Sequence, residues 1–511
     1  MTERLLRYHA SRWDEPVITE MGEPGRRGMM FDGDSGADAS IPAALRRKTP
    51  PELPELSEPE VFRHYLHLAQ MTLGMQGVSL FGTCTMKYNS PLSEAIAWRP
   101  EMAETHPGQD ESTLQGTLEF IHRFDLMLRE LSGMDQFIFQ PGGGADAAYT
   151  NCAVIRRWLA ARGELGKRDE IITSIQAHPC NPATAATAGF KVITLTLEEN
   201  GYPSLEQLKA AVSDRTAALM IGNPDDMGIY NPDIREWVRV VHEAGGLCFY
   251  DHANFNGVMG KLRARELGFD ACMYMLHKTF GAPKGGNGPS VGAYGCSAEL
   301  APFLPAPVVT KDDHGYHLDY DRPQACGKIR EYFGNAQQVM KAYAWTASMG
   351  AEGIHEASDL SVLANNYMDA RLAKIRGLSR SHAEIAGPRM EMTRWSMAPL
   401  QQDTGVSVLD VQRRMTDFGI DAFWLSHEPW LVPEPFTPEA GEMWSKEDID
   451  RWIDVLAAVV EEAYLDPGTV KSAPHRQAIH KLDGSALNDP RQFSTTMRRH
   501  RRIGNPPADA S

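Results

Sequence analysis

Short apolar segments that alternate with amphipathic stretches constrain the fold of this chain more than any other feature. Helical patterns, such as 204–213 and 233–245, lie between these segments. Continuous apolar strands separated by helices are typical of a mainly parallel sheet that helices cover on both faces. The sequence therefore predicts an α/β protein. The expected strands are FIFQ (137–140), EIITSI (170–175), KVITLTL (191–197), ALMIGN (218–223), LCFYD (247–251) and ACMYML (271–276).

The pattern changes along the chain and predicts four parts. The first part is too rich in proline, glycine and charge to form a core, so we interpret it as an arm. The second carries the strands, and it begins with helices such as 117–133, which Gly133 is expected to end. Long helices and a smaller α+β region follow, and the last part resembles a solvated, flexible tail. The predicted parts are the arm 1–60, the large domain 61–340, the small domain 341–466 and the tail 467–511.

Composition narrows the class of protein. The chain has 511 residues, of which 42% are hydrophobic, and a net charge of −16. No stretch is long and apolar enough to span a membrane, and the N-terminus lacks the apolar core of a secretory signal, so we expect a cytoplasmic enzyme. The acidic excess argues against a nucleic-acid partner. The seven cysteines form no CxxC pair, so neither a disulfide framework nor a metal site is predicted.

Chemically useful residues follow several of the expected strands. Ligands collect at the carboxyl ends of the strands in an open parallel sheet. The first strand runs into QPGGGADAAYTN, where three glycines precede a helix start and offer backbone N–H groups to a phosphate. His178 and Asn181 follow the second strand. Taken singly, a glycine-rich turn and a histidine after a strand are more often structural than functional.

Asp251 ends the fifth strand, and Lys278 follows the sixth. Each has an ordinary alternative, because a strand-end aspartate is often a helix cap and a lysine there is usually solvated. A glycine loop, a ring residue, an aspartate and a lysine in this order, however, match what pyridoxal 5′-phosphate (PLP) needs. The cofactor requires a phosphate cradle, a flat partner for its ring, an acid beside its pyridine nitrogen and a lysine that forms a Schiff base. The order of the residues therefore predicts a PLP site.

Longer motifs carry a family resemblance. The segment DHANFNGVMGKLRARELGFDACMYMLHKTFGAPKGGNGP (251–289) closely resembles the lysine region of the glycine cleavage system P-protein, glycine dehydrogenase (decarboxylating). The resemblance covers roughly residues 15–465, and the length and opening resemble the lysine-bearing subunit 2 of the split form of that enzyme. It implies the type I, aspartate-aminotransferase-like PLP fold, with a mainly parallel seven-stranded sheet in the large domain. Further motifs are EPGRRG, GTCTMKYNSPLSE, HPGQDESTLQG, PGGGADA, AHPCNPATA and GKIREYFGNAQQVMKAYAW.

The resemblance also assigns roles. Lys278 corresponds to the Schiff-base lysine and Asp251 to the partner of the pyridine nitrogen, while His178 is expected to stack on one ring face and Ala253 to lie against the other. The catalytic residues are thus expected to be Lys278, His178 and Asp251. The remaining expected cofactor contacts are Gly143, Gly144, Ala145, Asp146, Asn181, His277 and Thr279.

The segment GTCTMKYN (82–89) resembles the lining of the substrate entrance. For its cysteine, a buried small residue is as good an interpretation as a redox group. The expected entrance residues are Thr83, Cys84, Thr85, Lys87 and Asn89.

The activity that the resemblance implies is decarboxylation of glycine. Glycine would displace Lys278 from the cofactor, the ring would accept the electrons left by carbon dioxide, and the aminomethyl group would pass to a lipoyl carrier protein. The implied partners are a companion subunit 1 and that carrier, in a homo- or hetero-oligomer, with a small amino acid as substrate and with neither nucleic acid nor membrane.

Several motifs depart from the family pattern and leave an alternative open. Ala147 and Ala148 end the phosphate loop, Pro179 and Cys180 replace a Gly-Thr pair, GNPDDMG (222–228) replaces a TNPNTLG-like turn, and TPEAGEMWS (437–445) replaces an EPTE-type segment. The alternative is a diverged PLP enzyme that acts on another amino acid as a lyase, decarboxylase or transferase. A scaffold subunit without activity is the third interpretation, and Lys278 and Asp251 argue against it.

Overall fold

The computed structural model divides into two units. It describes residues 5–6, 8–28, 40–49, 51–72, 80, 90–198, 201–282, 290–420, 425–426, 430–481, 484, 489, 491 and 493–504. One unit comprises 79–409 and 422–460, and the other comprises 1–78, 410–421 and 461–511. This division does not test the predicted boundaries of the arm, large domain, small domain and tail, which stay predictions.

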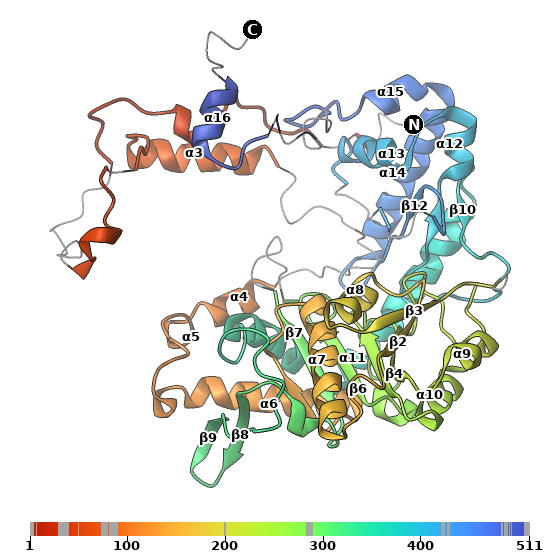
Figure 1. Cartoon of the computed structure of the whole chain (residues 1–511). Helices are drawn as coiled ribbons and strands as arrows, with labels where there is room; N and C mark the ends of the chain where they lie inside the picture. Colours follow the sequence, from red (N-terminus) through yellow and green to blue (C-terminus); the bar gives the residue numbers. More distant parts are fainter. Residues whose placement is uncertain are drawn as a thin grey trace. The chain divides into compact units, whose positions relative to one another are not determined.

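A seven-stranded sheet organises the larger unit (Figure 1). The strands lie in the order β1-β7-β6-β5-β4-β2-β3, and neighbours are parallel except where β7 pairs with β6 and β1. All six expected strands form, so the prediction of a mainly parallel α/β sheet is confirmed. Their bounds are β1 (Gln136–Ile138), β2 (Glu170–Ser174), β3 (Lys191–Leu195), β4 (Thr216–Gly222), β5 (Leu247–His252), β6 (Ala271–Met275) and β7 (Gly292–Cys296).

Strand β7 was not among the expected strands. Its segment GAYGC contains two glycines, which weaken the strand signal. Gly295 is required by packing, because a Cβ there would lie 2.2 Å from Cζ of Phe137 on the neighbouring strand. Gly295, which the packing requires, therefore weakens the pattern by which β7 could have been predicted from the sequence.

Helices cover both faces of the sheet, because alternate strand residues point to opposite sides. Leu219, Tyr250 and Tyr274 join the core beneath α6 and α10, whereas Met220 and Phe249 join the core beneath α7. The sheet is consequently buried on both sides, as continuous apolar strands require. The helices of this unit before the sheet's last strand are α4 (Pro91–Ala97), α5 (Pro100–Ala103), α6 (Gln115–Ser132), α7 (Gly144–Ala161), α8 (Cys180–Thr187), α9 (Leu205–Ala211) and α10 (Ile234–Glu243).

Helix ends follow local chemistry. Gly133 ends α6 in the left-handed region, at φ 75°, as expected from its position. Ser204 caps α9 by accepting a hydrogen bond from the backbone N–H of Gln207. Gly350, at φ 63°, interrupts the long helix α11 (Ala336–Leu372).

A hairpin and a small sheet complete the larger unit. The hairpin joins β8 (Val308–Asp312) to β9 (Gly315–Asp319), and the three-stranded sheet has the order β10-β11-β12. The remaining elements are β10 (Ser379–Arg380), β11 (Trp395–Ser396), α12 (Ala398–Thr404) and β12 (Pro435–Phe436), with α13 (Val408–Thr416) and α14 (Lys446–Leu465) each divided between the two units.

The second unit contains α3 (Glu58–Gln70), α15 (Pro467–Ser472) and α16 (Met497–Gly504). Buried Asp417 is an anchor of this unit, because its carboxylate pairs with Arg414 and accepts the backbone N–H of His475 and of Arg476. Among the described residues of the whole chain, no helix combines the length and apolar character needed to cross a bilayer.

Candidate active site

The carboxyl edge of the large sheet holds a cavity that all three expected catalytic residues line. Asp251 lies at the end of β5, Lys278 follows β6, and His178 follows β2. Because these strands are parallel, residues far apart in the chain meet at one edge. The lining residues are Ser174, Gln176, Ala177, His178, Gly222, Pro224, Asp225, Asp226, Asp251, Ala253, Asn254, Lys278 and Met392.

Asp251 is buried and held in a fixed orientation. Its Oδ2 accepts a hydrogen bond from Nδ2 of Asn181 at 3.0 Å, and its Oδ1 accepts the N–H of Ala253 at 2.9 Å. Burial raises the pKa of the Asp251 carboxyl, whereas the charge of His178 and the two hydrogen bonds oppose that rise. A cationic group brought against Asp251 would lower this raised pKa and stabilise the carboxylate.

Lys278 lies in a tight turn that excludes water from its side chain. The residue is 2% exposed. Its backbone N–H donates to the carbonyl of Met275 at 3.0 Å, and its own carbonyl accepts the N–H of Gly281 at 3.1 Å. Burying an ammonium group is costly unless the group is paired or reacts. The carboxyl of Asp251 lines the same cavity, so the turn presents the amine to an acid.

Thr279 connects the lysine turn to the loop after β5. Its Oγ1 accepts the N–H of Phe255 at 3.1 Å, which leaves the hydroxyl proton available for another acceptor. His277 is buried on the other side of the lysine, with Nδ1 3.4 Å from the carbonyl of Val291.

The glycine loop lies against the lysine turn. A Cβ on Gly143 would lie 3.8 Å from Cε1 of His277 and 3.4 Å from Oγ of Ser290, so a larger side chain would crowd both. Gly144 begins α7, whose free N–H groups and dipole favour an anion. Ala145 is the second residue of this helix. The loop and helix start therefore have the character of a phosphate cradle.

Asp146, which the sequence predicts to be a cofactor contact, also has partners within the protein. Its Oδ2 accepts the N–H of Gly142 at 3.0 Å and lies 3.3 Å from Nε of Arg330. A Cβ on Gly142 would lie 2.0 Å from Nη1 of the same arginine, so Arg330 covers the glycine loop. Arg330 lies within the motif GKIREYFGNAQQVMKAYAW, for which no individual roles are predicted, and its guanidinium, paired with Asp146, lies beside the loop.

These residues fit PLP. The Oδ1 of Asn181 is buried and has no hydrogen-bond partner among the described residues, so the site contains an acceptor that awaits a donor. Lys278 and Asp251 line one cavity, and the glycine loop contacts the residue before Lys278. The expected entrance residues Thr83, Cys84, Thr85, Lys87 and Asn89 lie outside the described residues.

Two of the departures from the family pattern have structural explanations. Ala147 and Ala148 are fully buried in the core beneath α7, where larger polar residues would have no room. Cys180 begins α8, and burial raises the pKa of its thiol well above the usual value, which keeps it a thiol rather than a reactive thiolate. Its backbone N–H donates to Nδ1 of His178 at 3.1 Å, so this segment also orients the ring residue.

Buried carboxyl groups accumulate beside the cavity. Burial raises the pKa of Asp225 to about 7, although the backbone N–H groups of Ile229 and Met227 lower it. Glu391 is fully buried, and neither of its carboxyl oxygens has a hydrogen-bond partner among the described residues. Burial raises the pKa of Glu391 well above its usual value, and the charge of Glu439 raises it further. We infer that Glu391 is protonated in the folded chain.

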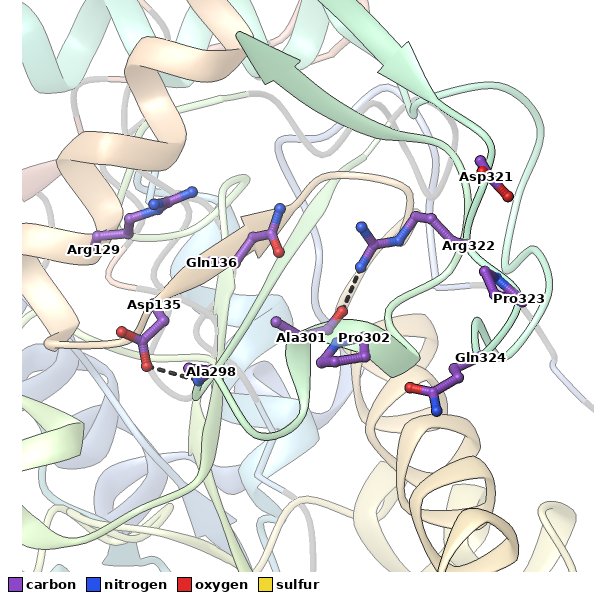
Figure 2. A pocket seen from close by; sticks show the side chains of 10 residues that line it. All are labelled: Arg129, Asp135, Gln136, Ala298, Ala301, Pro302, Asp321, Arg322, Pro323 and Gln324. Carbon is purple, nitrogen blue, oxygen red and sulfur yellow. Dashed lines mark hydrogen bonds between the residues drawn. The ribbon is translucent and has the colours of Figure 1, made fainter. Parts of the chain in front are cut away.

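Figure 2 shows a wider cavity, of about 630 Å³, at the opposite edge of the sheet. Gln136 at the start of β1 and Ala298 after β7 line it, and Asp135 accepts the N–H of Ala298 at 2.7 Å. Arg322 bonds to the carbonyl of Ala301 and pairs with Asp319 at 3.2 Å, and Arg129 pairs with Asp125. The charged side chains of Arg129, Asp135 and Arg322 thus have partners within the fold, and none of the expected catalytic residues lines this cavity.

Comparisons with known proteins agree with this geometry. The Aminotransferase class-V family model matches residues 134–291, which contain the glycine loop, Asp251 and Lys278. A Pyrococcus abyssi protein named "Probable glycine dehydrogenase (decarboxylating) subunit 2" is 42% identical over 480 residues, which cover 93% of this chain and 95% of that protein. A Staphylococcus saprophyticus protein of the same name is 39% identical over 92% of this chain and 94% of its own length.

Solved structures share the fold. A glycine decarboxylase (P-protein) of the glycine cleavage system, in inhibitor-bound form, aligns with a TM-score of 0.69 and 22% identity, over 83% of this chain and 94% of that chain. A NifS-like protein aligns with a TM-score of 0.58 and 14% identity, over 76% of this chain and all of that chain. The expected type I PLP fold is therefore confirmed.

We expect Lys278→Ala to abolish covalent retention of PLP, because it removes the amine in the cavity. The measurement is the visible absorbance of the purified chain supplied with PLP, followed by borohydride reduction and mass spectrometry of the peptide containing position 278. Lys374→Ala, at an exposed lysine of the same unit, is the control and should retain the label. A label retained by Lys278→Ala, or absent from the unmutated chain, would contradict the assignment.

We expect Glu391→Gln to stabilise the chain, and by more at about pH 8 than at about pH 5. The folded chain holds a proton on Glu391 that the unfolded chain releases above about pH 4.5, so this group lowers stability as the pH rises. A glutamine at position 391 has the shape of the protonated glutamate and does not titrate, so the free energy of unfolding no longer falls with pH because of this residue. Denaturant unfolding at both pH values measures the difference, with exposed Glu352→Gln as control. An equal effect at both pH values would show that Glu391 is ionised.

Proposed function

This chain belongs to the family of glycine dehydrogenase (decarboxylating) subunit 2, and we propose that Lys278 is the residue through which it binds PLP, the cofactor of this family. In this proposal the chain decarboxylates glycine and passes the remaining aminomethyl group to the lipoyl group of a carrier protein. The observation that carries it is the burial of Lys278 and Asp251 in one cavity beside His178. A diverged enzyme for another amino acid is not favoured by relatives of this identity and coverage.

Each residue of the cavity has a role that follows from its position. When bound, PLP supplies an electron sink for the bond between the α-carbon and the carboxyl group of glycine. Asp251 is placed to hold a proton at the pyridine nitrogen, and Asn181 and the Ala253 N–H keep its carboxylate oriented. His178 and Ala253 would confine the ring from its two faces. The Gly143–Gly144 segment and the start of α7 would hold the phosphate.

Lys278 is also suited to proton transfer once glycine has displaced it. Its amine stays in the cavity, because the turn at Met275–Gly281 fixes the backbone on both sides of the residue. The buried surroundings of Lys278 would exclude water, which would strengthen each electrostatic contact in the cavity. In this assignment residues 61–340 form the cofactor-binding domain and 341–466 the small domain.

The test is exchange of the carboxyl carbon of glycine with labelled bicarbonate. We expect the PLP-loaded chain, supplied with its companion subunit and a lipoyl carrier, to exchange label, and Asp251→Asn to exchange on the order of 100-fold more slowly because it loses a charge at the ring nitrogen. Exposed Asp313→Asn is the matched control and should retain the rate. No exchange by a PLP-loaded complex would contradict glycine as the substrate, and exchange of another amino acid would favour the alternative.

The partner is proposed to be a companion chain, because the relatives are named as subunit 2. Helix α3 offers a surface for it. His64 and His67 turn inward, with Nδ1 atoms 2.6 and 2.7 Å from the two carboxylate oxygens of Glu15. Phe62, which is 71% exposed, belongs to an apolar stripe on the opposite side. The members of the stripe, spaced as one helix face, are Phe62, Tyr65, Leu66 and Ala69.

A helix that packs its polar side and exposes its apolar side is positioned for a helix-in-groove contact. We expect the double variant Phe62→Glu with Leu66→Glu to lose binding to the companion chain, because two buried charges would lack partners. Co-purification and size-exclusion chromatography measure the complex, and Arg63→Glu on the same helix is the control. Unchanged binding would contradict the assignment, and loss of self-association instead would identify a second copy of the chain as the occupant.

A further inference from the structure

The loop that follows β5 lies between the two central residues of the site. It begins after His252, one residue beyond Asp251, and includes Ala253 and Asn254, which line the cavity. At Phe255 its backbone N–H donates to Oγ1 of Thr279, the residue after Lys278. A displacement of this loop would therefore change the placement of Asp251, of the ring-face residue Ala253 and of the lysine turn together.

The carboxylate of Glu439, which lies far from this loop in the sequence, accepts two hydrogen bonds from the loop. Oε2 of Glu439 accepts a hydrogen bond from Nδ2 of Asn254 at 2.9 Å, and Oε1 accepts one from Nδ2 of Asn256 at 3.0 Å. Glu439 and Asn256 are both buried. Glu439 is itself anchored, because its backbone N–H donates to the carbonyl of Leu80 at 3.3 Å.

Two amide donors require two acceptor oxygens, which only the ionised form of a carboxyl group supplies fully. Glu391 is a second buried carboxyl group, and the charge of Glu439 raises its pKa. It accepts no hydrogen bond among the described residues, so a charge on it would have no compensation there. Gly257 lets Glu391 come close to the loop, because a Cβ there would lie 2.0 Å from Oε2 of Glu391. The two acids thus have different roles. Glu439 accepts the two hydrogen bonds as a carboxylate, whereas Glu391 is a protonated side chain that packs against the loop.

We propose that Glu439 is a positioning residue, whose carboxylate bridges Asn254 and Asn256 and thereby fixes the loop that presents Asp251 and Ala253 to the cofactor. The inference rests on the proposed function for the identity of the cofactor, but it concerns binding and orientation rather than turnover. It also gives a role to the segment 437–445, which departs from the family pattern and lies far from the loop in sequence.

The test compares Glu439→Ala with Glu439→Gln by titration of PLP into the cofactor-free full chain. We expect Glu439→Ala to weaken PLP binding by about 10-fold or more, because two charge-assisted hydrogen bonds are lost. Glu439→Gln should recover most of the affinity. Asn256 has a buried Oδ1 without a partner among the described residues, so rotation of its amide could accept from the new side-chain amide.

The visible spectrum of bound PLP and its pH dependence provide the second measurement, because a purely structural role would not shift them. Glu439→Ala should change the pH at which the visible band shifts, and Asn256→Ala should produce part of the same change. The double variant should then show less than the sum of the two, as residues in contact do. Exposed Glu352→Ala is the control and should leave affinity and spectrum unchanged.

Equal affinity and an unchanged spectrum in Glu439→Ala would overturn the proposal, as would equal losses in the alanine and glutamine variants. If Glu439→Ala does not fold, Asn256→Ala alone decides, because a normal spectrum there would equally overturn it. Failure of glycine exchange by an unmutated chain that binds PLP normally would contradict the proposed function and leave this inference intact.

Discussion

The burial of a lysine and an aspartate in one cavity is the constraint on which the rest of the site depends. Lys278 and Asp251 follow neighbouring parallel strands, so the sheet itself sets their separation and their common edge. Each charge alone would be costly in such a place. Asn181 of α8 and the backbone N–H of Ala253 reduce that cost for Asp251 by two hydrogen bonds. A cofactor that bonds to the amine and offers a cation to the acid would relieve both costs at once.

The strand ends explain why so much could be predicted from the sequence. Continuous apolar segments locate the strands, and the residue after each segment is then forced to one edge, which is how Asp251 and Lys278 could be paired without a structure. Strand β7 was missed because packing against Phe137 requires a glycine that weakens the strand pattern. Glu439 was missed for a different reason. It contacts Asn254, 185 residues earlier, and a contact between residues so far apart in the chain cannot be predicted from local periodicity.

The departures from the family pattern differ in their consequences. Ala147 and Ala148 are core residues of α7, and Cys180 is a buried thiol that opens α8, so both changes concern packing around the site. The turn GNPDDMG is different, because Asp225 lines the cavity with Lys278. Oδ2 of Asp225 is buried without a hydrogen-bond partner among the described residues. Among these departures, the turn is therefore the one that places a carboxyl group in the cavity.

The carboxyl groups around the cavity also determine what it can accept. Asp225, Asp226 and Asp251 line it, and Glu391 and Glu439 lie next to the loop of Asp251. So many carboxylates cannot all be ionised in a buried region, and burial accordingly raises the pKa of Glu391 and of Asp225. The glycine loop, by contrast, has the helix terminus of α7 and the guanidinium of Arg330. The site is thus polarised, with a region for an anion at the loop and a region for a cation at the strand ends, which is the charge pattern of a phosphorylated pyridinium ring.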